Sequence, residues 1–126
     1  MGRTATFENL NLWKKTRVLR KEISKLVKKF PEEEKYKLVD QMLRASRSVT
    51  ANIAEGYGRF HYQENIQFCR QSRGGIFELL DHLTVSLDEG YIDEKIFSSF
   101  KNQIFEVILL LNGYIKYLKG RKVADD

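Results

Sequence analysis

The chain has 126 residues, of which 42% are hydrophobic, and a net charge of +5. This length suits one domain with a hydrophobic core. The single cysteine rules out an internal disulfide, and the longest nearly apolar run, 107–111, is far shorter than the roughly 20 residues that span a bilayer. Because the N-terminus also lacks the layout of a signal peptide, we expect one cytoplasmic domain over residues 1–126 with no membrane contact.

Apolar periodicity predicts four amphipathic helices, over about residues 8–29, 31–56, 63–89 and 93–119, and no strand. The first has apolar residues at alternating spacings of four and three, from Leu12 to Phe30. Four helices of this length joined by short loops return antiparallel to one another. The predicted fold is therefore all-α, an antiparallel up-down-up-down four-helix bundle.

Proline and glycine set the expected helix ends. Pro31 ends the first helix and, with the acidic residues after it, opens the second. Glycines 56 and 58 are expected to end the second helix, and Gly90 the third. Asp93 is the expected N-cap of the fourth helix, and we expect the tail from Gly120 to fray.

The fourth helix has more apolar surface than one core-facing stripe needs. Besides that stripe it carries Phe105, Leu109, Leu110, Tyr114 and Tyr117. Two interpretations stay open: a central helix buried on two sides, or a helix with part of its surface in a subunit interface.

Small residues predict a close contact between the second and third helices. Gly74 and Gly75 each cost about 1 kcal/mol against alanine inside a helix, so backbone contact is expected there. In antiparallel register the second helix offers small partners to this contact: Ala45, Ser46, Ala51 and Ala54. The two helices are expected to approach more closely there than the usual 8–10 Å.

Polar side chains surround the same expected contact: Arg44, Arg47, Asn52, Glu55 and, on the third helix, Glu78. If partly buried they must pair with one another, because an unpaired buried charge is very costly. We therefore predict an Arg/Asn/Glu network between the two helices. It is interpreted mainly as a device that sets helix register, with a catalytic or ligand-binding role as the alternative.

Positive charge is concentrated in residues 1–29, which hold nine Lys or Arg and two Glu. Five of the cations fall within about 80° of one another on the first helix, opposite its apolar stripe: Lys14, Arg17, Lys21, Lys25 and Lys28. This basic stripe is the candidate nucleic-acid-binding site, and a plain solvated face is the alternative. Binding is expected to be directed at phosphates, because no base-reading motif is present.

Aromatic residues are a weaker signal for nucleic acid. Trp13 borders the apolar stripe of the first helix and is expected in the core. Tyr57, Phe60 and Tyr62 lie around Arg59 and His61 in the loop after the second helix. They can stack on bases or cover the end of the bundle.

The sequence predicts no catalytic residue, metal site or cofactor. A di-iron bundle needs two Glu-x-x-His motifs, and His82 and His61 stand in no such motif. Cys69 lies on the apolar stripe of the third helix without a histidine partner, so a core role is expected. We expect a protein that is not an enzyme.

Taken together, these residues resemble the 23S ribosomal RNA intervening sequence proteins, also called the S23 family, which are bacterial four-helix bundles. The resemblance covers about residues 7–119. It is carried by Phe30-Pro31, Glu34, Gln41, Arg44-Ala45, Ser48-Val49, the run Ala51-Asn52-Ile53-Ala54-Glu55-Gly56, Gly58-Arg59, Ser72-Arg73-Gly74 and Glu78-Leu79. Gly75 departs from the pattern, since the family often has serine there.

The resemblance implies no established molecular activity. The family is similar in fold to the accessory protein of diversity-generating retroelements, a basic homopentamer that associates with a reverse transcriptase and with nucleic acid. It therefore implies a homo-oligomer, by this likeness a pentamer, that binds RNA or DNA. The alternative is a protein-interaction adaptor that binds a protein partner and no nucleic acid.

Overall fold

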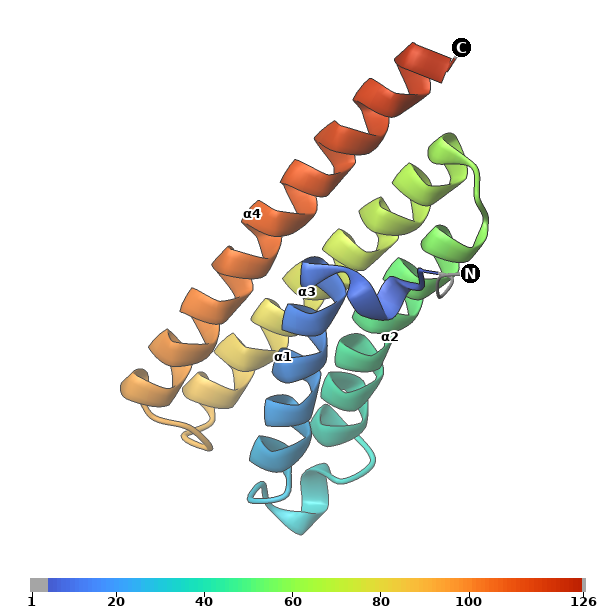
Figure 1. Ribbon diagram of the computed structural model, residues 1–126. Helices are drawn as coiled ribbons and strands as arrows, with labels where there is room; N and C mark the ends of the chain where they lie inside the picture. The colour runs from blue at the N-terminus through green and yellow to red at the C-terminus, as the bar shows by residue number, and fades with distance from the viewer. Residues whose placement is uncertain (1–4, 126) are drawn as a thin grey trace.

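The computed structural model describes residues 5–125, and the predicted domain limits at residues 1 and 126 lie outside them. These residues form α-helices and short 3₁₀ turns, with no strand in the described part. In chain order the elements are η1 (Phe7–Asn9), α1 (Asn11–Val27), η2 (Glu32–Glu34), α2 (Leu38–Gly58), α3 (Tyr62–Asp88) and α4 (Glu94–Asp125). Consecutive helices run in opposite directions (Figure 1), so the predicted all-α four-helix bundle is confirmed.

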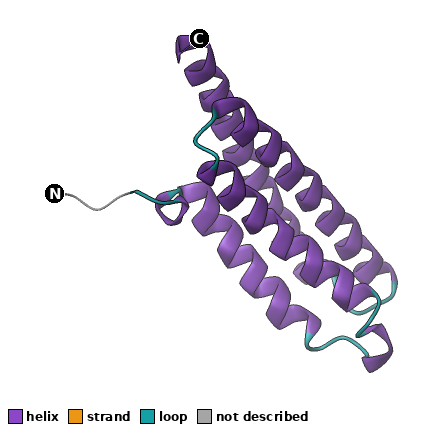
Figure 2. Ribbon diagram, turned by 90° about the vertical axis from the view of Figure 1, so that its right-hand side faces the viewer, coloured by secondary structure: helices purple, strands orange, loops and turns teal. Residues whose placement is uncertain are grey.

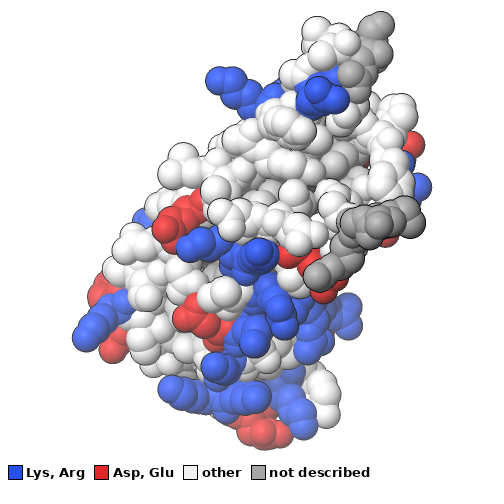
Figure 3. Space-filling view, in the orientation of Figure 1, with Lys and Arg blue, Asp and Glu red and all other residues white. Residues whose placement is uncertain are grey.

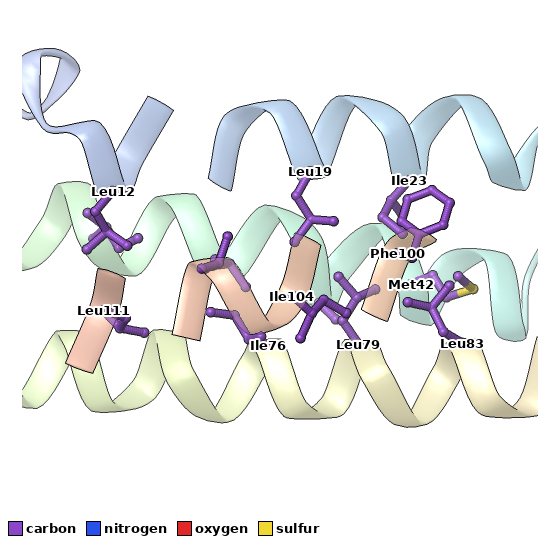
Figure 4. Close-up of a cluster of buried hydrophobic side chains, with 14 of the residues drawn as sticks. Leu12, Leu19, Ile23, Met42, Ile76, Leu79, Leu83, Phe100, Ile104 and Leu111 are labelled. Atoms are coloured by element: carbon purple, nitrogen blue, oxygen red, sulfur yellow. The ribbon is translucent and has the colours of Figure 1, made fainter. Parts of the chain in front are cut away.

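The four helices form a closed ring around one hydrophobic core. Both α1 and α3 contact α2 and α4, and the second view shows all four helices side by side (Figure 2). Each helix supplies fully buried side chains, among them Leu19, Ile23, Met42, Ile76, Leu83 and Ile104 (Figure 4). Burying each such side chain stabilises the fold by about 1.5–3 kcal/mol relative to leaving it exposed.

The helices differ in length. The first, α1, has 17 residues, whereas α3 has 27 and α4 has 32. At about 1.5 Å per residue, α4 is roughly 20 Å longer than α1, and it runs well past α1 at one end of the bundle (Figure 1). That end is therefore built from α2, α3 and α4 alone. No helix in the described chain has an apolar stretch long enough to cross a bilayer.

The first two helices begin later than predicted. Thr6 caps a separate 3₁₀ turn, Phe7–Asn9, and the extended backbone of Leu10 separates it from α1. Pro31 opens the 3₁₀ turn Glu32–Glu34 instead of α2. Lys37 has φ −121° and ψ −104°, which interrupts the helical path, so α2 begins only at Leu38.

The two loops at the end of the bundle that contains Pro31 are tied together. Glu34 Oε1 accepts a hydrogen bond from the Leu38 backbone N–H at 3.4 Å, and Oε2 accepts one from the Tyr91 hydroxyl at 2.7 Å. The Tyr91 ring also contacts Phe30, with centroids 5.3 Å apart. This end of the bundle is closed by paired polar groups and packed rings.

The predicted end of α3 and start of α4 are confirmed. Gly90 has φ +77°, and backbone hydrogen bonds from Gly90 to Leu87 (3.0 Å) and from Tyr91 to Ser86 (2.9 Å) form a Schellman motif. Asp93 Oδ1 accepts a hydrogen bond from the Ile96 backbone N–H at 2.8 Å, which makes Asp93 an N-cap.

The predicted role of Gly56 as a helix stop is wrong, because α2 continues through it to Gly58. A Cβ on Gly56 would lie 2.8 Å from both Asn65 Oδ1 and Phe68 Cβ, so this glycine lets α2 and α3 approach each other. The residue with left-handed backbone at this end is Phe60, with φ +54°. Such a conformation costs a side-chain-bearing residue roughly 1–2 kcal/mol.

The small-residue contact is confirmed at Gly75 and not at Gly74. A Cβ on Gly75 would lie 3.1 Å from Ser48 Oγ and 3.8 Å from the Ala45 carbonyl, while one on Gly74 would meet nothing within 4 Å. The Ser72 hydroxyl donates a 2.9 Å hydrogen bond to the Val49 carbonyl across the same contact. Ala51 and Ala54 are wrongly predicted here, since both line a cavity with Trp13 and Arg20 of α1.

The predicted fraying from Gly120 is also wrong, because α4 continues to Asp125. Its last turns contact the start of α3. Lys122 Nζ donates to Gln63 Oε1 at 2.7 Å, and Arg121 Nε donates to the Tyr62 hydroxyl at 3.4 Å. These contacts hold a segment that the sequence pattern alone leaves without an apolar stripe.

Candidate nucleic-acid interface

The five residues of the basic stripe lie exposed on the outer side of α1, with Lys28 as its C-cap. The opposite side of the helix is the buried one, lined by Leu12, Thr16, Leu19, Ile23 and Val27. Lys and Arg side chains gather over the lower half of the molecule in the view of Figure 3, where α1 faces the viewer in Figure 1. The structure thus brings the predicted cations to one surface.

The stripe is extended by cations that sequence reasoning did not place there. Arg44 and Arg47, predicted to lie in a partly buried network, are exposed on α2. A cavity of about 380 Å³ between α1 and α2 is lined by Lys28, Lys35 and Arg47 above the apolar side chains of Val27 and Val39. The signal for this arrangement lies in the helical phase of α2, since Arg47 falls nearly opposite Ala45 and Gly56, which face α3.

A second cavity, of about 460 Å³, continues along the same pair of helices. It is lined by Arg20 and Arg47 together with Trp13 and Thr50. Arg20 Nη1 donates a 2.9 Å hydrogen bond to Thr50 Oγ1, which fixes its guanidinium between α1 and α2. The two cavities meet at Arg47 and form a groove that adjoins the basic stripe at Lys28, with Glu32 as an acidic residue in its lining.

The predicted polar network between α2 and α3 does not form, because Arg44, Glu55 and Glu78 each pair within their own helix. Arg44 Nε pairs with Asp40 at 2.9 Å, Glu55 pairs with Arg59 at 3.2 Å, and Glu78 meets His82 at 3.2 Å. Each pair joins residues four apart on one helix. These side chains therefore do not bridge α2 and α3, where the contact is made by Gly75, Ser72 and backbone carbonyls.

The physical reason for the error is the phase of α2. Arg44, Arg47 and Glu55 lie on its solvent side, whereas Asn52 is half-buried. Exposed ion pairs of this kind contribute little, about 0–1 kcal/mol each. Within the signature run 51–56, Ala51 and Glu55 are exposed, whereas Ile53 and Gly56 are buried. Gly56 serves the α3 contact together with Ala45, Ser48 and Val49, which precede the run on α2.

Cys69, the one side chain of this sequence that is a strong nucleophile when ionised, has a structural role. Burial raises the pKa of the Cys69 thiol from 9.0 to about 12, and Sγ lies 3.6 Å from Asn65 Oδ1. A thiol with that pKa is a poor nucleophile at neutral pH. Within residues 5–125, no cluster of three His, Cys, Asp or Glu side chains is arranged to hold a metal ion.

The aromatic residues of the sequence separate into two places. Trp13 is half-buried, with its ring 5.0 Å from that of Phe7 and the Arg17 guanidinium 5.7 Å above it. The loop aromatics lie at the C-terminal end of α2, where Tyr57 and Phe60 have ring centroids 6.5 Å apart. Phe60 is 88% exposed.

Large apolar side chains are exposed on α4. They include Phe105 (44% exposed), Leu109 (73%) and Val123 (78%), which fall within about 40° of one another on the helix. Neighbouring α4 residues Ile104, Leu111 and Leu118 are buried in the core. The outer side of α4 therefore carries an apolar stripe, interrupted by Lys116 between Leu109 and Val123, that the described part of the chain does not cover.

Comparison with known proteins agrees with this architecture. The family model described as 23S rRNA-intervening sequence protein matches residues 8–113. A crystal structure from Bacteroides thetaiotaomicron, of a protein with unknown function from the S23 ribosomal protein family, is similar with a TM-score of 0.74 and 22% sequence identity. The likeness covers 83% of this chain and 98% of the other. No curated protein matches the chain.

Proposed function

The chain belongs to the 23S rRNA-intervening sequence protein family, and on that premise we propose that it is a non-enzymatic, oligomeric bundle that binds nucleic acid through the basic stripe of α1. The observation that carries the proposal is the set of five exposed cations on one side of one helix. The proposal needs no cofactor and places the protein in the cytoplasm.

The stripe suits a phosphate backbone in its dimensions. From Lys14 to Lys28 it extends over about 21 Å at 1.5 Å per residue, which is long enough to contact several consecutive phosphates. Lysine binds phosphate as a compact point charge, and arginine can bind two phosphate oxygens at once. Five such contacts on a duplex would lower log affinity with log salt at a slope of about −4.5.

The groove between α1 and α2 broadens this surface. Arg20 is held in place by Thr50, so little side-chain freedom is lost when it contacts a ligand. Arg47 and Lys35 add charge on the other side of the groove. Binding of this kind positions the protein on a backbone and reads base sequence weakly.

Oligomerisation is supported by the exposed apolar stripe of α4, which a second copy of the chain would cover. The resemblance to the retroelement accessory protein suggests a homopentamer. Repeating the basic stripe around a ring would raise overall affinity by avidity without any new contact.

The test compares two charge-reversed variants that change net charge equally. K21E/K25E alters the stripe, whereas K15E/K29E alters exposed lysines that lie outside it. Gel shifts and fluorescence anisotropy with duplex DNA and structured RNA are measured at rising salt. We expect K21E/K25E to lose at least about tenfold in affinity and K15E/K29E to retain most of it. Equal losses, or no binding by the unmodified protein at low salt, would reject the proposal.

A protein-interaction adaptor is the second candidate, and the α4 stripe favours it. The native mass with and without nuclease separates the two functions. A nucleic-acid-binding oligomer loses mass on nuclease treatment and keeps its protein stoichiometry. An adaptor keeps its mass and co-purifies with another protein.

A further inference from the structure

An aromatic cleft lies at the end of the bundle where α2 passes into α3 and where α4 runs past α1 (Figure 1). We define it by six lining residues: Tyr57, Phe60, His61, Tyr62, Tyr114 and Tyr117. Its volume is about 450 Å³, which is within the range of small-molecule sites. It is separate from the basic stripe and contains none of its residues.

One wall of the cleft is held in an unfavourable conformation. Phe60 has left-handed backbone, φ +54°, at a position where glycine is normally preferred, and its ring is 88% exposed. The core does not use this ring, and its nearest aromatic neighbour is Tyr57 at 6.5 Å. Strained backbone that presents an exposed side chain is typical of a ligand site.

The other wall offers flat aromatic surface. The rings of Tyr114 and Tyr117 are stacked, with centroids 6.1 Å apart and an interplanar angle of 18°. Tyr117 is 57% exposed and Tyr114 is half-buried. Two aromatic walls around an open volume favour a planar ring that stacks on them.

The inner part of the cleft is polar and oriented. Asn65 is 7% exposed, and its Nδ2 donates a 3.2 Å hydrogen bond to the Tyr114 hydroxyl oxygen. Because that oxygen accepts from Asn65, the Tyr114 O–H remains a donor, and burial raises the pKa of Tyr114 so that the proton stays in place. The imidazole of His61 adds a donor or an acceptor. The ligand should therefore have hydrogen-bonding atoms on the edge of its ring.

Cations stand at the rim of the cleft. The Arg121 guanidinium lies 5.9 Å over the Tyr62 ring and donates to the Tyr62 hydroxyl at 3.4 Å. Lys122 follows it and is held by Gln63 at 2.7 Å. Positive charge beside an aromatic site is the arrangement that binds a base together with its phosphate.

From these walls, polar groups and cations, we propose that the aromatic cleft binds an unpaired nucleobase. The base stacks against Phe60 and Tyr117, its edge meets Tyr114 and His61, and its phosphate lies toward Arg121. A base inside a duplex is already stacked and paired, so the ligand is a single-stranded segment or a free nucleotide. The proposal concerns a second site and does not depend on binding by the basic stripe.

The first experiment maps the site by NMR with adenosine 5′-monophosphate, using ribose 5-phosphate as the probe that lacks the base. Spectra are recorded at about 0.5 M salt, where phosphate contacts of the exposed stripe are screened. We expect saturable shifts at Phe60, Tyr114 and Tyr117 with the nucleotide and none with ribose 5-phosphate. Shifts confined to α1, equal shifts with both probes, or no shift at about 10 mM nucleotide would overturn the proposal.

The second experiment uses F60A and Y117A, with Y36A as the matched control because Tyr36 is 83% exposed far from the cleft along the chain. Circular dichroism checks that each variant is folded. We expect affinity for the nucleotide to fall roughly tenfold in F60A and in Y117A, in keeping with the loss of one stacking partner, and to stay unchanged in Y36A. Unchanged affinity in folded F60A and Y117A contradicts the assignment.

The source of the base is decided by a third comparison at the same salt. A 12-nucleotide single strand, a hairpin of the same composition and the mononucleotide are titrated into the unmodified protein. Tighter binding of the single strand than of the mononucleotide, lost in F60A, identifies a nucleic-acid segment as the ligand. Equal affinity for both identifies the free nucleotide. Preference for the paired hairpin stem rejects an unpaired base.

Discussion

The two ends of the bundle are built in contrasting ways. At the end with the loops after α1 and α3, which we call the relaxed end, Glu34 pairs with Tyr91 and Asp93 caps α4. The left-handed position there is occupied by Gly90. At the other end, Phe60 takes the left-handed conformation that Gly90 takes at the first, and an open cleft remains beside it. At the first end the left-handed position is held by a glycine, which adopts it without strain. At the other end the same conformation is imposed on Phe60, at a cost in stability, beside the aromatic cleft.

The largest effect is expected from Gly56, which sets the approach of α2 to α3 at the aromatic end. In G56A the added Cβ meets Asn65 and Phe68 at 2.8 Å, so the free energy of unfolding should fall by about 1–3 kcal/mol. Urea denaturation measures it. G74A is the matched control, because its Cβ has open space, and it should be stabilised by about 1 kcal/mol. Equal behaviour of the two variants would show that the approach at Gly56 is not tight.

The variant G90A measures how much the left-handed glycine stabilises the relaxed end. An alanine at φ +77° is strained, and the cost is partly offset by the smaller entropy of its unfolded chain, so G90A should lose about 1 kcal/mol. Thermal and urea unfolding check this value. An unchanged stability would mean that the Schellman turn can rearrange, and the contrast between the two ends would weaken.

The Glu34–Tyr91 hydrogen bond gives the relaxed end a dependence on alkaline pH. The hydrogen bond from the Tyr91 hydroxyl to the Glu34 carboxylate is the main cause that raises the pKa of Tyr91 from 10.0 to about 12. Because the folded pKa lies above the unfolded one, the stabilisation is fully present below pH 10 and is lost as pH rises through 12.

The measurement is the difference in melting temperature between the unmodified protein and Y91F. The unmodified protein should melt higher at pH 8, and the gap should close between pH 10 and 12. The Cys69 pKa is raised in both proteins, so its contribution cancels in the comparison. A gap that stays constant with pH would mean that the hydrogen bond to Glu34 does not raise the pKa of Tyr91 in the folded protein.

The smallest effect is expected at Phe60, and it has the opposite sign. F60G relieves the left-handed strain at the cost of a more flexible unfolded chain, so stability should rise by about 0.5–1 kcal/mol. The same variant should lose nucleotide binding. Denaturant midpoints of F60G and F60A separate the two causes, since only glycine relieves the strain. A decrease in F60G stability would show that the ring supports the fold.

Periodicity was sufficient for the bundle, because core-facing residues such as Leu19, Ile53 and Leu83 repeat at helical spacing whatever the details of the loops. Periodicity did not predict the start of α2 or the end of α4, which depend on individual side-chain contacts. Glu34 closes a 3₁₀ turn ahead of α2, and Tyr62 and Gln63 hold the end of α4, neither of which leaves a periodic signal.

The candidate sites also divide into a part that helical periodicity predicts and a part that individual contacts determine. The basic stripe could be predicted because Lys14 to Lys28 share one helical face. The groove was missed because Arg47 was assigned to a partly buried polar network on the strength of nearby small residues. Gly56 was misread for a related reason: a glycine near a helix end resembles a stop signal, and only the facing Asn65 shows that it provides space.

The ring in which each helix packs on its neighbours in sequence also bears on how the chain folds. The contacts α1–α2, α2–α3 and α3–α4 join segments that are adjacent along the chain, whereas in the described residues distant segments meet at the α1–α4 contact and at the smaller η1–α2 contact. Low contact order of this kind goes with folding in microseconds to milliseconds. We therefore expect the bundle to refold within milliseconds, a rate that stopped-flow fluorescence of Trp13 would measure.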